Sequence, residues 1–247
     1  MAVYTRSTIR YNIISRQRVY NALITILGVF VVFFIGSVLL SQKLLIARYV
    51  LSKNGYYIYY KKAKEYIMSI DLQDAKVYHN SHYIAHLSYI RAGIYPPDIL
   101  NVSLTCENGY TDIKEHLISK HIRILSQRFP LGCIKNNKYT SQGELNSKLY
   151  ITPSYVKGFM DFKNLNINSY HIKSLKLSFH KKDKGSIFTF DGKATFLGKE
   201  LSIKGSGTVD INQDSLANSK ISGIGLIDNT IHIAFGGDLV NPQIDIK

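Results

Sequence analysis

Three histidines that lie close together in the sequence are the residues whose type and spacing come nearest to a metal site. His79, His82 and His86 carry imidazole nitrogens, which are common ligands of transition metals. On a β-strand, however, His82 and His86 would share a face about 13 Å apart. No cysteine or carboxylate joins the three histidines in this segment. We therefore expect surface or turn histidines and predict no metal site.

Sequence motifs of common enzyme classes are also missing. His116 and His121 in KEHLISKH do not have the HExxH spacing of a zinc protease. Gly205-Ser206-Gly207 lies in a strand-like pattern, without the strand–turn–helix context of a nucleophile elbow. The stretch GIGLID lacks the spacing of a dinucleotide-binding loop, and the carboxylates are scattered among lysines. We predict no catalytic residues and no cofactor, and therefore a protein that is not an enzyme.

The charge of the chain bears on its partners. The sequence has 31 Lys and Arg against 17 Asp and Glu, a net charge of +14. A positive field of this kind attracts nucleic acid or anionic lipid, and part of it also serves as an ordinary solvated lysine surface. No zinc-finger spacing, aromatic RNP pattern or dense arginine tract is present, so no nucleic-acid partner is expected. Membrane lipids are the expected partners, together with other envelope proteins.

The chain contains two cysteines, Cys106 and Cys133. Two are too few for a disulfide scaffold or for a four-cysteine zinc site. They are a possible disulfide if the domain lies in an oxidising compartment, and otherwise two buried thiols.

The strongest pattern in the sequence is an apolar run near the N-terminus. Residues Leu23 to Leu40 carry no charge, and a helix over 21–42 would cross a hydrocarbon core of about 30 Å. The run is longer than the apolar core of a signal peptide, and no small-x-small cleavage site follows it, so we predict a retained transmembrane anchor. The basic tail 1–20 favours a cytoplasmic N-terminus, although lysines also follow the span.

Two segments connect this anchor to the C-terminal part. Residues 43–74 are basic and rich in tyrosine, which is typical of a juxtamembrane stalk or helix, or else of a tyrosine-rich first strand. Residues 75–149 are predicted to form an α+β segment. It begins with a hairpin that turns at Asn80-Ser81. An amphipathic helix follows over 112–127, where Asp112 and Glu115 have the spacing of a capping box.

Beyond residue 150, apolar and polar residues alternate in short stretches such as YHIKSLKLSF and SIFTFDGKATF. This period of two predicts antiparallel strands with one buried face. Asp228-Asn229 is expected to form a tight turn, and the glycines within the strands predict bulges or strong curvature: Gly205, Gly207, Gly223 and Gly225. The predicted fold class is α+β, mainly β. A single transmembrane helix and one amphipathic helix precede a curved antiparallel meander over 150–247.

The repeated G-x-apolar strands, which end in GGDLVNPQIDIK behind one N-terminal span, resemble bacterial AsmA-like envelope proteins and the N component of type II secretion. The resemblance covers roughly 150–247. It implies a β-sheet groove in the periplasm whose apolar concave face shields lipid chains, on a protein of the bacterial inner membrane. This chain is short, which does not favour a continuous bridge across the periplasm.

These patterns predict a single-pass envelope protein whose sheet domain binds or shields apolar chains. The alternative is a scaffold or assembly subunit of a secretion or envelope complex. The lipid-facing candidates would fit a plain core equally well, and they are Phe188, Phe190, Phe196, Leu201 and Ile203.

Overall fold

The computed structural model describes residues 29, 42–96, 98–134, 141–167, 170–182, 185–196, 198–212, 218–238 and 241–246. The chain divides into two compact units, 1–43 and 44–247. The predicted tail 1–20 lies outside the described residues, and so does the predicted anchor 21–42 apart from Val29 and Gln42. Within the described ranges, no helix is both long and apolar enough to cross a bilayer.

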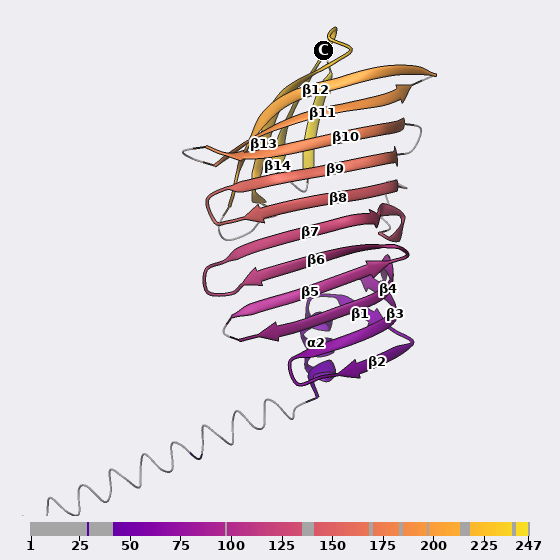
Figure 1. Cartoon of the computed structure of the whole chain (residues 1–247), viewed down its shortest axis with the longest axis vertical. Helices are drawn as coiled ribbons and strands as arrows, with labels where there is room; N and C mark the ends of the chain where they lie inside the picture. The colour runs from indigo at the N-terminus through magenta and orange to yellow at the C-terminus, as the bar shows by residue number, and fades with distance from the viewer. Residues whose placement is uncertain are drawn as a thin grey trace, which may run out of the picture. The chain divides into compact units, whose positions relative to one another are not determined.

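The second unit is built on one antiparallel β-sheet (Figure 1). Fourteen strands follow one another in the order β1-β3-β4 and so on to β15, and β2 also pairs with β3. The described elements are α2 (Lys43–Lys53), β1 (Tyr56–Tyr59), β2 (Lys62–Glu65), β3 (Ser69–His79), β4 (His82–Tyr95), β5 (Ile99–Cys106), β6 (Gly109–His116), β7 (His121–Pro130), the 3₁₀ turn η1 (Leu131–Cys133), β8 (Ser141–Ile151), β9 (Val156–Ile167), β10 (Tyr170–Lys181), β11 (Ser186–Phe196), β12 (Lys199–Asp210), β13 (Lys220–Ile227), β14 (Ile231–Asp238) and β15 (Asn241–Ile246).

Tight turns produce this meander, and two of them were predicted. Asn80 and Ser81 join β3 to β4 with φ of 47° and 67°, and Asp228 and Asn229 lie between β13 and β14 with φ of 55° and 58°. Positive φ at two central residues matches the right-handed twist of the flanking strands. Both turns, and the meander over 150–247, are therefore confirmed.

The helix predicted over 112–127 is wrong, because this segment is the hairpin of β6 and β7. Ile113 pairs with Ile124, and Glu115 pairs with Ile122. The apolar residues of this segment fit a strand period as well as a helical one. Pairing with β5 on one side and β8 on the other satisfies the backbone of both strands.

The two segments predicted separately, 75–149 and 150–247, contribute strands to the same sheet. β8 includes residue 150 and pairs with both β7 and β9. In the segment 43–74, residues Lys43–Lys53 form a helix. The tyrosine-rich stretch Tyr56–Tyr59 is strand β1, paired with β3, so the alternative of a first strand is confirmed there.

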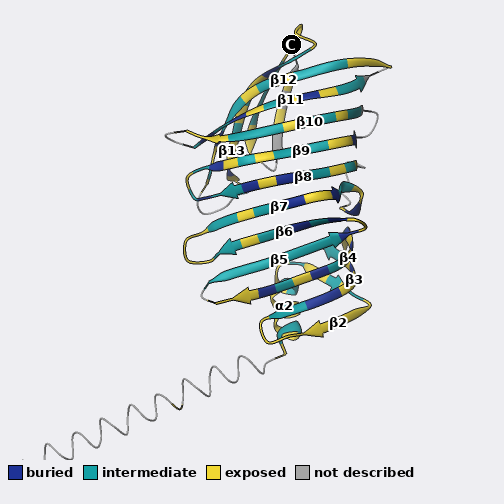
Figure 2. Cartoon of the chain, viewed as in Figure 1, coloured by how far each residue is buried: buried dark blue, intermediate teal, exposed yellow. Residues whose placement is uncertain are grey.

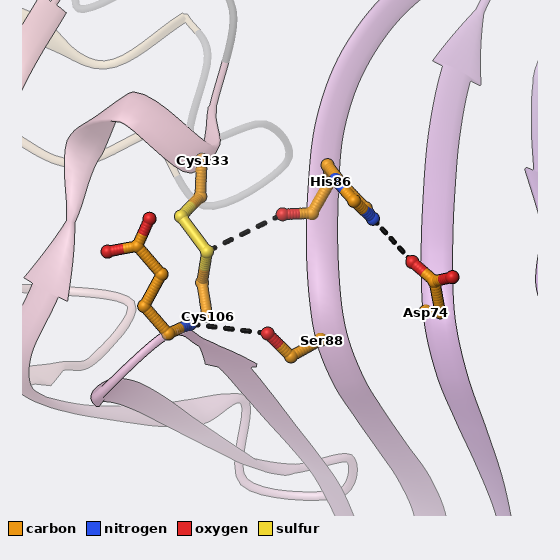
Figure 3. Close-up of polar contacts among 6 residues, drawn as sticks. Asp74, His86, Ser88, Cys106 and Cys133 are labelled. Atoms are coloured by element: carbon orange, nitrogen blue, oxygen red, sulfur yellow. Dashed lines mark hydrogen bonds and ion pairs between the residues drawn. A yellow bond between two sulfur atoms is a disulfide. The ribbon is translucent and has the colours of Figure 1, made fainter.

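A compact core lies at the β3–β4 end of the sheet. In Figure 2, buried, half-buried and exposed segments alternate along most strands. Cys106 and Cys133 are joined by a disulfide across a Cα–Cα distance of 6.5 Å, which links β5 to η1. Figure 3 shows this bridge beside β4, where the Cys106 sulfur lies 3.5 Å from the His86 carbonyl oxygen. The buried core residues are Leu72, Ala75, Ala85, Leu87, Ile90, Cys106, Phe129 and Cys133.

An ion pair ties β3 to β4 on the opposite face of the sheet from Leu72 and Ile90. Arg91 donates from Nε and Nη2 to the two carboxylate oxygens of Asp71, each at 2.8 Å. The Asp71 side chain is 7% exposed, whereas that of Arg91 is 44% exposed. The hydrogen bonds from Arg91 hold the pKa of Asp71 below its ordinary value. Burial, followed by the hydrogen bond to Asp71, raises the pKa of Tyr89 to about 12.

Replacing both cysteines, Cys106→Ser with Cys133→Ser, should lower the free energy of unfolding by about 3 kcal/mol. The bridge spans a sequence separation of 27, and the unfolded chain without it gains the entropy of that loop. Urea unfolding of the full chain would measure the difference. A reductant should lower the midpoint of the wild type and leave the double variant unchanged. Equal urea midpoints for the wild type and the double variant without reductant would contradict the role of the bridge.

Asp71→Asn should lower the free energy of unfolding by about 1.5 kcal/mol near neutral pH, because the charge-assisted hydrogen bonds from Arg91 weaken. A lowered folded-state pKa stabilises the fold above the ordinary aspartate pKa of about 4, and this contribution is lost as pH falls through the lowered value. The gap between wild type and variant should therefore close below about pH 4. Asp245→Asn, at an exposed position of β15, is the control and should change stability by less than about 0.5 kcal/mol.

Candidate functional site

The register of the sheet sorts its side chains into two chemically different faces. Residues directly opposite each other on neighbouring strands point to the same side. One side of the sheet, which we call the inner face, carries two rows of directly opposite residues that run from β5 to β14. One row is Val102, Ile113, Ile124, Leu149, Gly158, Phe179, Phe188, Gly207, Gly223 and Phe235, and the other is Leu104, Thr111, Ser126, Ser147, Met160, Leu177, Phe190, Gly205, Gly225 and Ile233.

The outer face is mostly polar and charged. Across β9 to β12 it carries a row of alternating sign, in which each residue lies opposite the next: Asp161, Lys176, Asp191 and Lys204. The ammonium of Lys204 lies 3.6 Å from Asp191, and Lys173 lies 3.6 Å from Glu200. Apolar residues also occur on this face, such as Ile224, which is 69% exposed. The two faces therefore differ in what they can bind.

Three hydroxyls on the inner face are hydrogen-bonded to one another. Thr111 donates a hydrogen bond to the Ser126 hydroxyl at 3.0 Å, and Ser147 donates to the same oxygen at 2.9 Å. All three hydroxyls are buried. Because buried polar groups are costly only when unpaired, this trio keeps the inner face compatible with an apolar ligand.

The C-terminal end of the inner face is an aromatic cluster laid over glycines. The Phe235 ring lies 5.7 Å from the rings of both Phe188 and Phe190, although β14 is three strands away from β11. Gly205 pairs with Gly225, and Gly207 with Gly223, without any register shift. These four glycines are therefore not bulges. A Cβ atom at Gly207 would come within 2.7 Å of the Phe188 ring. Glycine, which has no side chain, therefore leaves room for the phenylalanine rings. This packing occurs where β13 and β14 curl behind β8 to β12 (Figure 1).

At its C-terminal end the sheet folds back on itself, so that Phe235 of β14 packs on Phe188 and Phe190 of β11. The principal close backbone contacts join neighbouring strands, and η1 additionally packs on β4 and β8. At the other end, helix α2 covers the inner face of β3 and β4. A cavity of about 440 Å³ lies there, with Leu44 and Leu51 of α2 and Ile70, Leu72 and Ile90 of the sheet among its lining residues. Most apolar side chains of the inner face from β6 to β10 are only half-buried, including Ile113, Ile124, Met160 and Leu177.

Four of the five lipid-facing candidates predicted from the sequence lie on this inner face. Phe188 is 2% exposed and belongs to the aromatic cluster, while Phe190, Leu201 and Ile203 are half-buried. The side chain of Phe196 lies outside the described part of the chain.

Sequence reasoning missed Phe179 and Leu177 of β10 and Phe235 of β14, although all three continue the inner rows. The same period of two was present in YHIKSLKLSF and NTIHIAFGG and could have identified them.

The three histidines considered as metal ligands go to different places. His79 lies opposite His82 across the β3–β4 turn, and the centre of its ring lies 4.4 Å from that of the tilted Tyr56 ring. His86 instead forms an ion pair with Asp74 when protonated, and this hydrogen bond lowers the pKa of the Asp74 carboxyl. In the described ranges, no three His, Cys, Asp or Glu side chains are grouped so as to hold a metal ion.

Comparison with models of protein families, with curated proteins and with solved structures finds no match to this chain. The chemistry of the two faces therefore carries the functional argument.

Gly207→Ala should destabilise the fold by about 1–3 kcal/mol, because the new methyl group would overlap the Ser222 carbonyl oxygen and the Phe188 ring. Gly236→Ala is the matched control on β14. Its Cβ would meet only the Ile221 carbonyl oxygen, at an ordinary 3.8 Å. Thermal unfolding of the two variants would compare them. A Gly236 variant as unstable as the Gly207 variant would contradict the packing of rings over glycine.

Proposed function

We propose that this chain is a non-enzymatic, membrane-anchored envelope protein whose sheet binds or shields the apolar chains of lipids on its inner face. The observation that carries the proposal is that most apolar side chains on the inner face of β6 to β10 are only half-buried. A sheet with one apolar face normally buries it against a second layer. From β5 to β10 the inner face is largely apolar, interrupted by the hydrogen-bonded hydroxyls of Thr111, Ser126 and Ser147, and most of its apolar side chains are not fully buried by the described elements.

Three further features support this function. The uncharged run Leu23 to Leu40 would hold the sheet beside a bilayer. The Cys106–Cys133 bridge is typical of proteins in an oxidising compartment, which agrees with a periplasmic location of the sheet. The inner face also matches the apolar groove that the resemblance to AsmA-like proteins implies.

Two residues of β10 offer a direct test. Leu177 belongs to the inner face, and Ser174 of the same strand belongs to the outer face, opposite Lys163 and Lys193. A photo-crosslinking amino acid placed at either position in the full chain samples the two faces with the same probe on the same strand. After irradiation of intact cells, mass spectrometry of the purified protein would identify the adducts. We expect lipid adducts at position 177 and few or none at 174.

Equal lipid labelling at both positions, or no lipid at 177, would overturn the proposed lipid function. Protein adducts at both positions without lipid would favour the scaffold or assembly role instead. Urea unfolding of each unirradiated variant would show that the probe leaves the fold intact.

A further inference from the structure

A basic hollow lies on the outer face, at the edge of the sheet where β8 turns into β9. Its volume is about 830 Å³. The charged or titratable side chains that line it are all basic, and no carboxylate is among its described lining residues. They are Arg123, Lys148, Lys157, Lys176, His180 and Lys181.

Three of these cations, Arg123, Lys148 and Lys157, have no carboxylate opposite them in the register, whereas Lys176 belongs to the row of alternating charge. In the row from Asp161 to Lys204 each lysine lies opposite a carboxylate. Arg123 of β7, in contrast, lies directly opposite Lys114 of β6. On its other side Arg123 lies opposite Tyr150 of β8, and Tyr150 lies opposite Lys157 of β9. Like charges directly opposite each other destabilise a sheet. No ion pair within 4.0 Å joins Arg123, Lys148 or Lys157 to a described carboxylate.

Aromatic rings hold this cluster in place. The Tyr150 hydroxyl hydrogen-bonds to Nδ1 of His121 at 3.0 Å, and Lys157 lies over the Tyr150 ring at 5.4 Å. On the neighbouring turn, Lys181 lies over the ring of Tyr155 at 4.9 Å. Because these contacts already restrain the side chains of Lys157 and Lys181, both lysines lose less conformational entropy when they bind an anion.

The turn that carries Tyr155 is itself rigid. The buried Thr152 hydroxyl accepts hydrogen bonds from the backbone N–H groups of Ser154 and Tyr155, at 3.3 and 3.0 Å. The next backbone N–H, that of Val156, donates to the hydroxyl of Ser186 on β11. This edge of the hollow is therefore preorganised.

We infer that the hollow binds a ligand with at least two phosphate groups, independently of what the inner face binds. Arg123 and Lys157 stand two strands apart, about 10 Å, which suits two phosphates of one ligand. The guanidinium of Arg123 can contact one phosphate through two parallel N–H bonds, and the lysines supply mobile point charges. A phosphorylated lipid headgroup and a soluble polyphosphate share this chemistry.

The full-length chain in an uncharged detergent allows the test. Binding of inorganic triphosphate, measured by titration calorimetry at low and at moderate salt, samples the soluble source. Binding to vesicles that contain cardiolipin, a lipid with two phosphates in its headgroup, against vesicles of phosphatidylcholine alone, samples the headgroup. The variant combines Arg123→Gln with Lys157→Gln. The matched control combines Lys199→Gln with Lys220→Gln, which removes equal charge at exposed positions of β12 and β13.

We expect at least one probe to bind, and the Arg123/Lys157 variant to bind it about tenfold more weakly or worse, since two charge-assisted contacts are lost. The affinity of the control variant should stay within about twofold of the wild type, because it loses only the general attraction of two surface charges. Binding of triphosphate alone would assign a soluble ligand, and binding of cardiolipin vesicles alone would assign a headgroup. Equal losses in the two variants, or binding of neither probe by the wild type, would overturn the inference. Circular dichroism of each variant would verify the fold.

Discussion

The structure depends first on the register of one long backbone hydrogen-bond ladder. Each strand from β3 to β14 is paired on both sides, and consecutive residues point to opposite faces. A slip of one residue in any pairing would exchange the faces of that strand. On β10 it would turn Lys176 toward the inner face and Leu177 toward water. The cost of burying a lysine and exposing a leucine therefore locks the register along the sheet.

A sheet with one apolar face must be closed at its ends, and this chain closes each end by a different means. At the first end, α2 and η1 cover the inner face, and the Cys106–Cys133 bridge ties β5 to η1. At the second end, the sheet curls until Phe235 meets Phe188. Bulky side chains at Gly207 and Gly223 would block that curl, so a stretch of paired glycines is part of the packing.

The two faces divide the chemistry of the molecule. The inner face offers apolar surface and hydroxyls that satisfy each other, which suits a hydrocarbon chain. The outer face carries much of the positive charge, partly neutralised in the row that includes Asp191 and left without carboxylates in the hollow around Tyr150. An amphiphile with phosphate groups would find both of its chemistries on one sheet, with the hollow at the sheet edge. The net charge of +14 would then attract anionic partners to the molecule as a whole, and the cations of the hollow would bind phosphate groups at one place.

The sequence by itself determined the features that short-range geometry controls: the strand alternation after residue 150, the turns at Asn80-Ser81 and Asp228-Asn229, and the apolar candidates such as Phe190. It mistook 112–127 for a helix because apolar residues there satisfy both periods. Only pairing decided between them, of β6 with β7 and of this hairpin with β5 and β8. The bridge, the contact of Phe188 with Phe235 and the placement of Arg123 and Lys157 on one face, two strands apart, required the tertiary structure. Dihedral preferences and periodicity act within a few residues, whereas cross-strand neighbours are set by how the whole ladder pairs.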